Sequence, residues 1–197
     1  MRQLSLAVLI LVLLIRSIPA QVIRSGNCTV DYELLQLPAC ALETHNGKLY
    51  LSKPYLQLFF SPTGKSLATG TPGNLASTYL PDEGWAYLDH TGLVVVRNVA
   101  VMDNGANAFH YELVRITRSG KWGLADIHGK IVVPFTYDGM LDYQKGQGWP
   151  ACTGCSYVHQ GEYGYFRGGK WVALTRQGKA GLPIDPPLGS QNPKPHN

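Results

Sequence analysis

The stretch Trp122-Gly-Leu-Ala-Asp126-Ile-His-Gly129 predicts the fold of this chain, because its pattern of a tryptophan followed seven residues later by a glycine occurs three times. The other two copies are Trp85-Ala-Tyr-Leu-Asp-His-Thr-Gly92 and Trp171-Val-Ala-Leu-Thr-Arg-Gln-Gly178. A fixed internal spacing of this kind is typical of an array of similar structural units. The structural repeat positions are therefore Trp85, Gly92, Trp122, Gly129, Trp171 and Gly178.

The residues around Trp122 predict a three-stranded β-meander. Glycine at the end of a four-residue turn supplies the positive φ that a tight hairpin needs, and Asp or Thr at its start can bond the backbone of its own turn. The predicted order is a strand at 113–117, a turn at 118–121, a strand at 122–125, a turn at 126–129 and a strand at 130–133, which Pro134 ends.

The other copies fit the same frame less closely. The first runs from Gly84 to Val96, and the last starts with Gly168-Gly169, read as a hairpin turn, and stops near Pro183. A fourth, degenerate copy at 57–67 keeps the turn but has Gln57 in place of the tryptophan. The predicted fold class is therefore all-β, with tandem β-meander repeats, three recognisable and one degenerate, in one domain.

The second copy, extended as Gly120-Lys-Trp122-Gly-Leu-Ala-Asp126-Ile-His-Gly129-Lys-Ile-Val-Val-Pro134-Phe-Thr-Tyr137-Asp138, resembles the WG-repeat family. The match is specific in that unit and looser at Trp85 and at Trp171, which Val172 follows instead of glycine. The resemblance implies an all-β repeat protein, commonly exported in bacteria, with no catalytic residues and no enzymatic activity. It covers about residues 56–182.

The two ends of the sequence predict export and a flexible tail. Arg2, the apolar run 4–15 and the small residue Ala20 fit a signal peptide at 1–20, and the run is too short to span a bilayer. No other long apolar segment follows, so we expect no membrane span after cleavage, and a periplasmic or secreted location. Residues 183–197 are rich in proline and predict an extended, disordered tail. Between these ends lie an N-terminal cover segment at 21–55 and the repeat domain at 56–182.

The charge of the mature chain argues against nucleic acid as a partner. Loss of Arg2 and Arg16 with the signal peptide lowers the basic count from 17 to 15 against 13 acidic residues, a net charge of +2. The remaining basic residues are scattered along the sequence, whereas phosphate binding needs a clustered basic face.

An insertion at about 139–163, between the second and third units, is the predicted binding region. Long insertions with their own aromatic residues are where repeat proteins often carry function. The predicted binding residues are Tyr143, Trp149, Tyr157, His159 and Tyr163.

The four cysteines favour disulfides in an exported protein. We expect the local pairing of Cys28 with Cys40 and of Cys152 with Cys155, although a crossed pairing stays open. Redox catalysis at Cys152-Thr-Gly-Cys155 is disfavoured because no helix is predicted after the first cysteine. A zinc site at Cys152, Cys155 and His159 would lack a fourth ligand.

Three functions follow from these observations. The first is an exported, non-enzymatic binding protein whose partner is another envelope or secreted protein, with no metal and no cofactor. The second is a carbohydrate or cell-wall binding module that stacks sugar rings on exposed aromatic side chains. The third is a thiol-disulfide or zinc protein that uses Cys152 and Cys155.

Overall fold

The computed structural model describes residues 21–26, 40–68, 71–80, 84–102, 105–160 and 163–187. The predicted signal peptide, Cys28 and the predicted tail from residue 188 onward lie outside the described residues. The side chains of Cys40 and Tyr163 lie outside them as well. What the sequence predicts for these parts stays a prediction.

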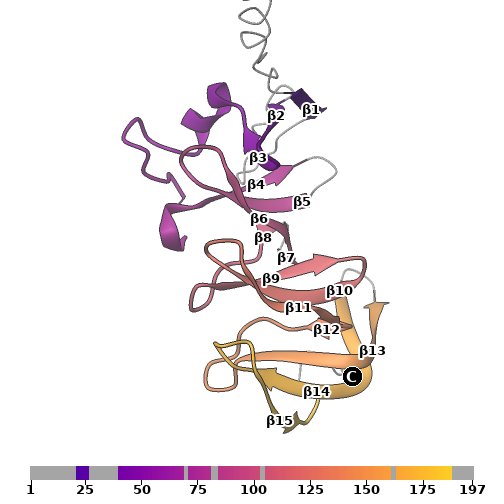
Figure 1. Ribbon diagram of the computed structural model, residues 1–197. Helices are drawn as coiled ribbons and strands as arrows, with labels where there is room; N and C mark the ends of the chain where they lie inside the picture. Colours follow the sequence, from indigo (N-terminus) through magenta and orange to yellow (C-terminus); the bar gives the residue numbers. More distant parts are fainter. Residues whose placement is uncertain are drawn as a thin grey trace, which may run out of the picture.

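The described residues form antiparallel β-sheets and no α-helix, which confirms the predicted all-β class. The sheets follow one another in chain order, so that Figure 1 shows a stack with β1 at one end and β15 at the other. The strands are β1 (Gln21–Gly26), β2 (Cys40–His45), β3 (Lys48–Leu51), β4 (Ala76–Leu80), β5 (Gly84–Leu88), β6 (Val94–Val99), β7 (Val101–Met102), β8 (Gly105–Ala106), β9 (Leu113–Arg118), β10 (Lys121–Asp126), β11 (Ile131–Tyr137), β12 (Gly139–Met140), β13 (Trp149–Gln160), β14 (Tyr163–Leu174) and β15 (Ala180–Ile184).

Three larger sheets make up the stack. The first has the order β1-β2-β3, the central one the order β11-β10-β9-β6-β5-β4, and the last the order β12-β13-β14-β15, while β7 and β8 form a separate pair. We call β4–β6, β9–β11 and β13–β15 the first, second and third meanders. The first and second meanders are continuous through the pairing of Val99 with Ile116.

The second meander has the predicted strand order, with one difference. Strand β11 continues through Pro134 to Tyr137, so the expectation that Pro134 ends the strand is wrong. Trp122 pairs with Tyr137 and Leu124 with Val133, which leaves extra residues of β11 bulged opposite Gly123. A proline is tolerated in such a bulge because the ladder needs no amide there. Gly123 is required because a Cβ atom would overlap the carbonyl oxygen of Val133.

The third meander is longer than the sequence pattern predicts. The expected insertion at 139–163 provides β12 and β13, and β13 pairs with β14 along its length, from Trp149 opposite Leu174 to Gln160 opposite Tyr163. Gly168 and Gly169 are therefore not a hairpin turn but lie within β14. Both have positive φ, as does Gly154 in the facing strand, so the two strands bend together at this point.

Where the sequence predicts the degenerate copy, the turn is present and a 3₁₀ helix lies before it. Residues Lys53–Leu58 form a 3₁₀ helix, η1, with Pro54 in its first turn, where the missing amide costs no hydrogen bond. Another short 3₁₀ helix, η2, spans Pro72–Asn74. Within the predicted cover segment, β2 and β3 form a hairpin over Asn46-Gly47, both with positive φ, as a type I′ turn requires.

Four turns in the stack share one set of hydrogen bonds together with a glycine in the fourth position; the turn at Gln144–Gly148 has the same two backbone bonds with Gln147 in that position. In the turn from Asp126 to Lys130, the amide of Asp126 donates to the carbonyl of Lys130 (2.9 Å), and the amide of Gly129 donates to the carbonyl of Asp126 (2.9 Å). Oδ1 of Asp126 also accepts bonds from the amides of His128 and Lys130. The same two backbone bonds occur in the turns at Ser61–Lys65, Asp89–Leu93 and Thr175–Lys179, each with a glycine of positive φ in the fourth position.

Three of these turn glycines touch the sheet strand that lies before them in the stack. The carbonyl of Gly92 accepts a hydrogen bond from the amide of Leu51 in β3 (2.8 Å). A Cβ atom on Gly129 would overlap the carbonyl oxygen of Val95 in β6, and one on Gly178 would lie 2.8 Å from Cγ1 of Val132 in β11. Each turn therefore packs closely against the preceding part of the chain.

The hydrophobic core joins neighbouring meanders. One cluster combines Trp85 and Val96 of the first meander with Val114 and Ile116 of the second. The next cluster combines Leu113, Leu124 and Val133 of the second meander with Trp149 and Leu174 of the third, around Met140. These two clusters therefore cross the boundaries between neighbouring meanders, whereas a further cluster of Cys152, Cys155, Phe166 and Trp171 lies within β13 and β14.

Candidate functional site

The structure divides the predicted binding residues between two places. Trp149 starts β13 and Tyr143 lies just before it, whereas Tyr157 and His159 lie at the far end of the same strand. Eight residues separate Trp149 from Tyr157, which is up to about 26 Å at the roughly 3.3 Å rise of a strand. The five residues therefore do not form a single surface.

Trp149 is a core residue with 0% exposure, so the expectation that it belongs to a binding surface is wrong. Its ring packs edge-on against Tyr143 at a centroid distance of 5.0 Å, and it lies in the cluster that contains Leu124 and Met140. Its Nε1 has no hydrogen-bond partner among the described residues. The buried indole thus holds the ring of Tyr143 in place.

Tyr143 belongs to a group of exposed and half-buried side chains that we call the aromatic surface, which consists of His110, Tyr111, Tyr143 and Arg176. The ring of Tyr143 stacks on His110 (5.4 Å, 22°) and meets Tyr111 edge-on (5.0 Å). The guanidinium carbon of Arg176 lies 3.1 Å from the ring centroid of Tyr111. The group joins the approach to β9, the segment before β13 and the turn after β14.

Tyr111 and Tyr143 lie close enough to change each other's ionisation. Hydrogen bonding with Tyr143 raises the pKa of Tyr111, and hydrogen bonding with Tyr111 lowers the pKa of Tyr143. Arg176 lies close enough to favour the ionised form of both phenols. The cation thus lies over one of the two phenol rings and close to the other.

Tyr111 is held outward by an unusual turn. Tyr111 and Glu112 both have positive φ, at 50° and 64°, in a two-residue turn closed by paired backbone bonds between His110 and Leu113 (2.8 and 3.0 Å). A bulky residue without glycine's freedom is rare in this conformation, and each instance costs about 1–3 kcal/mol. The turn leaves Tyr111 49% exposed, which makes it a candidate contact residue.

A buried network of polar side chains contacts the residues of the aromatic surface. The guanidinium of Arg115, buried in β9, donates to Oδ1 of Asn107 (3.1 Å) and to the carbonyl of Met140 (2.9 Å). Oδ1 of Asp142 lies 3.7 Å from Nε of Arg115 and 3.5 Å from Nε2 of His110. Burial lowers the pKa of Arg115, and the carboxylate of Asp142 opposes this effect. The network ties His110 and Tyr143 to the core through Asp142.

The remaining predicted residues lie at the end of the β13–β14 hairpin. Tyr157 is 52% exposed and packs edge-on against His159 (4.9 Å) and Phe166 (5.1 Å). Its hydroxyl lies over Gly164, where a Cβ atom would overlap it. This end of the hairpin is a second exposed aromatic position, without a cation among the contacts of Tyr157.

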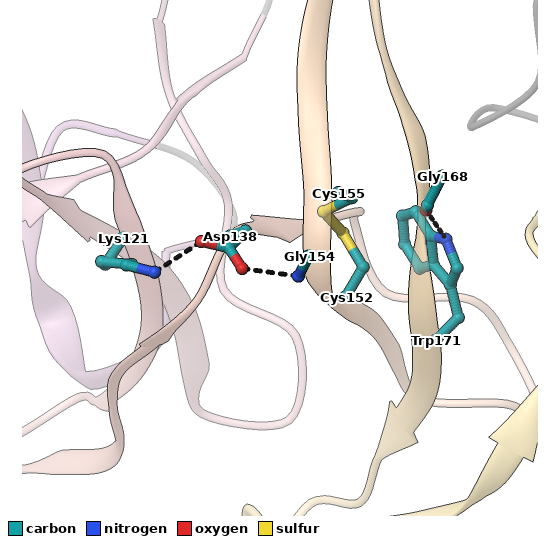
Figure 2. Close-up of a disulfide and its surroundings, with 7 residues drawn as sticks. All are labelled: Lys121, Asp138, Cys152, Gly154, Cys155, Gly168 and Trp171. Carbon is teal, nitrogen blue, oxygen red and sulfur yellow. Dashed lines mark hydrogen bonds and ion pairs between the residues drawn. A yellow bond between two sulfur atoms is a disulfide. The ribbon is translucent and has the colours of Figure 1, made fainter.

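Cys152 and Cys155 form a disulfide, which confirms the predicted local pairing for these two residues. Figure 2 shows the disulfide beside Trp171, whose Nε1 donates to the carbonyl of Gly168 (3.0 Å). On the other side, the amide of Gly154 donates to Oδ2 of Asp138 (2.7 Å), and Asp138 pairs with Lys121. These bonds hold the pKa of Asp138 below its usual value, the bond from Lys121 having the larger effect.

The surroundings of the disulfide are those of a structural bond. Cys152 and Cys155 are both buried, in contact with Phe166 and Trp171, so the sulfurs are shielded from a thiol reagent. As disulfide sulfurs they do not supply the thiolates that zinc binds. The described residues contain no group of three or more His, Cys, Asp or Glu side chains placed to hold a metal ion. Nor does any helix in that part of the chain have the length and apolar character needed to cross a membrane.

Sequence reasoning missed His110, Tyr111 and Arg176. Their spacing from Tyr143 gives no signal, because three separate segments bring them together. One local signal for Tyr111 was present in the sequence. The pair Tyr111-Glu112 directly precedes a strongly β-prone run, at a position where a hairpin turn normally has Asn-Gly.

Comparison with known proteins gives no relative for this chain: no family model, no curated protein and no solved structure matches it.

Proposed function

We propose that this protein is an exported, non-enzymatic binding protein of the WG-repeat type, which contacts another envelope or secreted protein through the aromatic surface. The partner class rests on the chemistry of that surface. Export rests on the apolar N-terminal segment and on the disulfide, which persists in oxidising compartments.

The repeat assignment is supported by the turns rather than by the tryptophans alone. Four turns share the same backbone bonds and a glycine in the fourth position. Two successive turns place their glycines on equivalent valines, Val95 and Val132, each three residues past the preceding turn glycine. Such contacts between neighbours are what an array of similar units requires. They agree with the resemblance of residues 120–138 to the family pattern.

The observation that carries the binding function is Tyr111, exposed on its strained turn, with Arg176 over its ring and Tyr143 at its edge. Tyrosine and arginine are enriched among the residues that dominate protein interfaces. Rings already fixed by Trp149, Asp142 and the turn lose little freedom on binding, so their contact area contributes more to affinity. The surface is therefore preorganised for a partner.

The test compares partner capture by wild-type protein and by Tyr111→Ala, with the chain from Gln21 onward as bait in an envelope extract of the source organism. We expect one stoichiometric protein to be retained by the wild type and lost with Tyr111→Ala, at an unchanged melting temperature. Tyr79→Ala is the matched control, because Tyr79 is also exposed but lies in β4, and it should retain the partner. Equal capture by all three proteins would exclude the aromatic surface.

A glycan is the second candidate ligand, because His110 and Asp142 place polar groups beside stacked aromatic rings. Sugars stack on such rings and bond to such side chains. Sedimentation of the protein with cell-wall polysaccharide, lost with Tyr111→Ala and without any captured protein, would favour this function over the first.

A further inference from the structure

A cavity lies where the first and second meanders meet, and none of the residues of the aromatic surface lines it. Strand β6 pairs with β9 through Val99 and Ile116, and β9 pairs with β10 along its length. The turn after β10 returns to β6, where Gly129 packs on the carbonyl of Val95. These strands and this turn therefore surround the cavity, which has a volume of about 380 Å³.

The floor of the cavity is apolar. Val96, Ile116 and Ala125 line it, are each 2% exposed, and belong to the core cluster that the two meanders share. Two further apolar side chains line its wall, the half-buried Phe135 and Ile131, which is 49% exposed. The volume is near the lower end of the range for small-molecule pockets, so the floor can receive a short apolar chain.

Two β-bulges supply side chains to the mouth of the cavity. An extra residue in β6 before Val99 places Arg97 and Asn98 in a bulge, with Asn98 at a φ of 59°. The bulge of β11 contains Phe135, whose ring centroid lies 4.6 Å from the guanidinium carbon of Arg118. Bulges of this kind redirect side chains and are frequent beside functional sites. Both meanders therefore contribute to one mouth.

The mouth carries positive charge. Arg97 and Arg118 line it, and no Asp or Glu among the described residues does. The side chain of Arg118 is exposed and makes no hydrogen bond or ion pair to another described residue, while the ring of Phe135 restricts its position. A guanidinium presents paired N–H donors that match the two oxygens of a carboxylate. A cationic mouth above an apolar floor therefore complements a carboxylate attached to a short apolar chain.

We infer that this cavity binds a small free carboxylic acid, whose carboxylate bonds to Arg118 and whose apolar chain lies on the floor. The size of the cavity favours a free acid over a peptide, because it has room for a short chain and not for the residues that precede a chain end. The site is separate from the aromatic surface, so the protein can hold this ligand whether or not a partner is bound there.

Isothermal titration calorimetry of the chain from Gln21 onward, with hexanoate as the probe, tests the binding. We expect one hexanoate to bind per chain. Hexanamide has the same chain without the charge, and acetate has the charge without the chain. Each should bind at least about tenfold more weakly than hexanoate, because one loses the charged hydrogen bonds and the other the apolar contact.

Substitutions at exposed positions locate the site. Arg118→Gln should weaken hexanoate binding by about tenfold or more, because it removes the charged donor. Ile131→Ser removes part of the apolar wall and should weaken hexanoate binding several-fold, while leaving the response to acetate unchanged. Arg167→Gln is the matched control, because Arg167 is also an exposed arginine but lies in β14, and it should bind like the wild type. Circular dichroism checks that each variant is folded.

Three results would overturn the inference: no binding of hexanoate by the wild type at millimolar concentration, equal binding of hexanoate and hexanamide, or unchanged affinity in Arg118→Gln. A peptide ending in leucine that binds more tightly than hexanoate would overturn the free acid as the ligand, in favour of the end of a protein chain. Tyr111→Ala should bind hexanoate like the wild type, so the outcome of partner capture leaves this test unaffected.

Discussion

Arg115 shows how a single residue links the core to the surface. Its guanidinium bonds to Asn107 and to the carbonyl of Met140, and it faces the carboxylate of Asp142, which in turn lies near His110. A buried cation is costly unless its bonds are satisfied, and removing the guanidinium takes a charged donor from Asn107 and from the carbonyl of Met140.

Replacing Arg115 by Met should therefore lower the free energy of unfolding by about 2–4 kcal/mol, since buried acceptors lose the bonds that the guanidinium donates. Urea denaturation measures this change. Arg118→Met is the matched control in the same strand, because Arg118 is exposed and lies over the ring of Phe135, and it should cost less than about 1 kcal/mol. Equal losses in both variants would show that the network contributes nothing beyond a surface arginine.

The lowered pKa of Asp138 predicts how the stability of the protein changes in acid. Its pKa is lowered in the folded protein by the bond from Lys121 and by the amide of Gly154, so its contribution is present above the ordinary value of 3.8. The contribution is lost as the pH falls from there through the lowered folded pKa. Asp138→Asn should remove this dependence, because the amide does not ionise.

The measurement is the melting temperature of both proteins between pH 2 and pH 7. The wild type should be more stable than Asp138→Asn at pH 7, and the two curves should converge at the acid end. A constant difference across the whole range would show that the ionised carboxylate is not the stabilising group.

At the scale of elements, the turn glycines set how closely successive meanders pack. Gly120 and Gly129 have nearly the same φ, 74° and 78°, in neighbouring turns of the second meander. A Cβ atom on Gly120 would meet nothing within 4 Å, whereas one on Gly129 would overlap the carbonyl of Val95. Substituting each glycine in turn therefore separates the cost of backbone strain from the cost of disturbed packing between meanders.

Gly120→Ala should destabilise the protein by about 1–2 kcal/mol, the cost of a left-handed residue. Gly129→Ala should cost about 1–3 kcal/mol more, because the turn must also move away from β6. Urea denaturation of both variants under the same conditions measures the difference. Equal costs would mean that the turn does not pack on β6.

The elements also show what the sequence could predict. The hairpins around Trp122 were predictable, because alternating β-prone residues and glycine turns are local signals. Three features were not predictable: the bulge at Pro134, the bend at Gly168 and Gly169, and the helical turn at Lys53–Leu58. The first two depend on the strand that pairs with them, and the third forms where no partner strand is present among the described residues. The sequence predicted only part of the aromatic surface. Tyr143 was among the predicted binding residues, but its neighbours come from distant segments of the chain, and Trp149 is buried in the core.

For the whole molecule, the shared clusters decide whether the stack unfolds in parts. Trp149 of the third meander lies with Leu124 and Val133 of the second, whereas the first meander meets the second through Trp85, Val96 and Ile116. The second and third meanders should therefore lose structure together, because Leu124 and Val133 of the one and Trp149 of the other bury their side chains in the same cluster.

Trp149→Ala tests this coupling, with an expected loss of about 3–5 kcal/mol for removing a buried aromatic side chain. Hydrogen exchange followed by mass spectrometry should show lost protection in β9–β11 as well as in β13–β14, with a smaller loss in β4–β6. Protection lost in β13–β14 alone would mean that the meanders are independent, and that the tryptophan fills only its own unit. Because Trp149 also supports Tyr143, coupled loss would mean that the aromatic surface exists only when both meanders are folded.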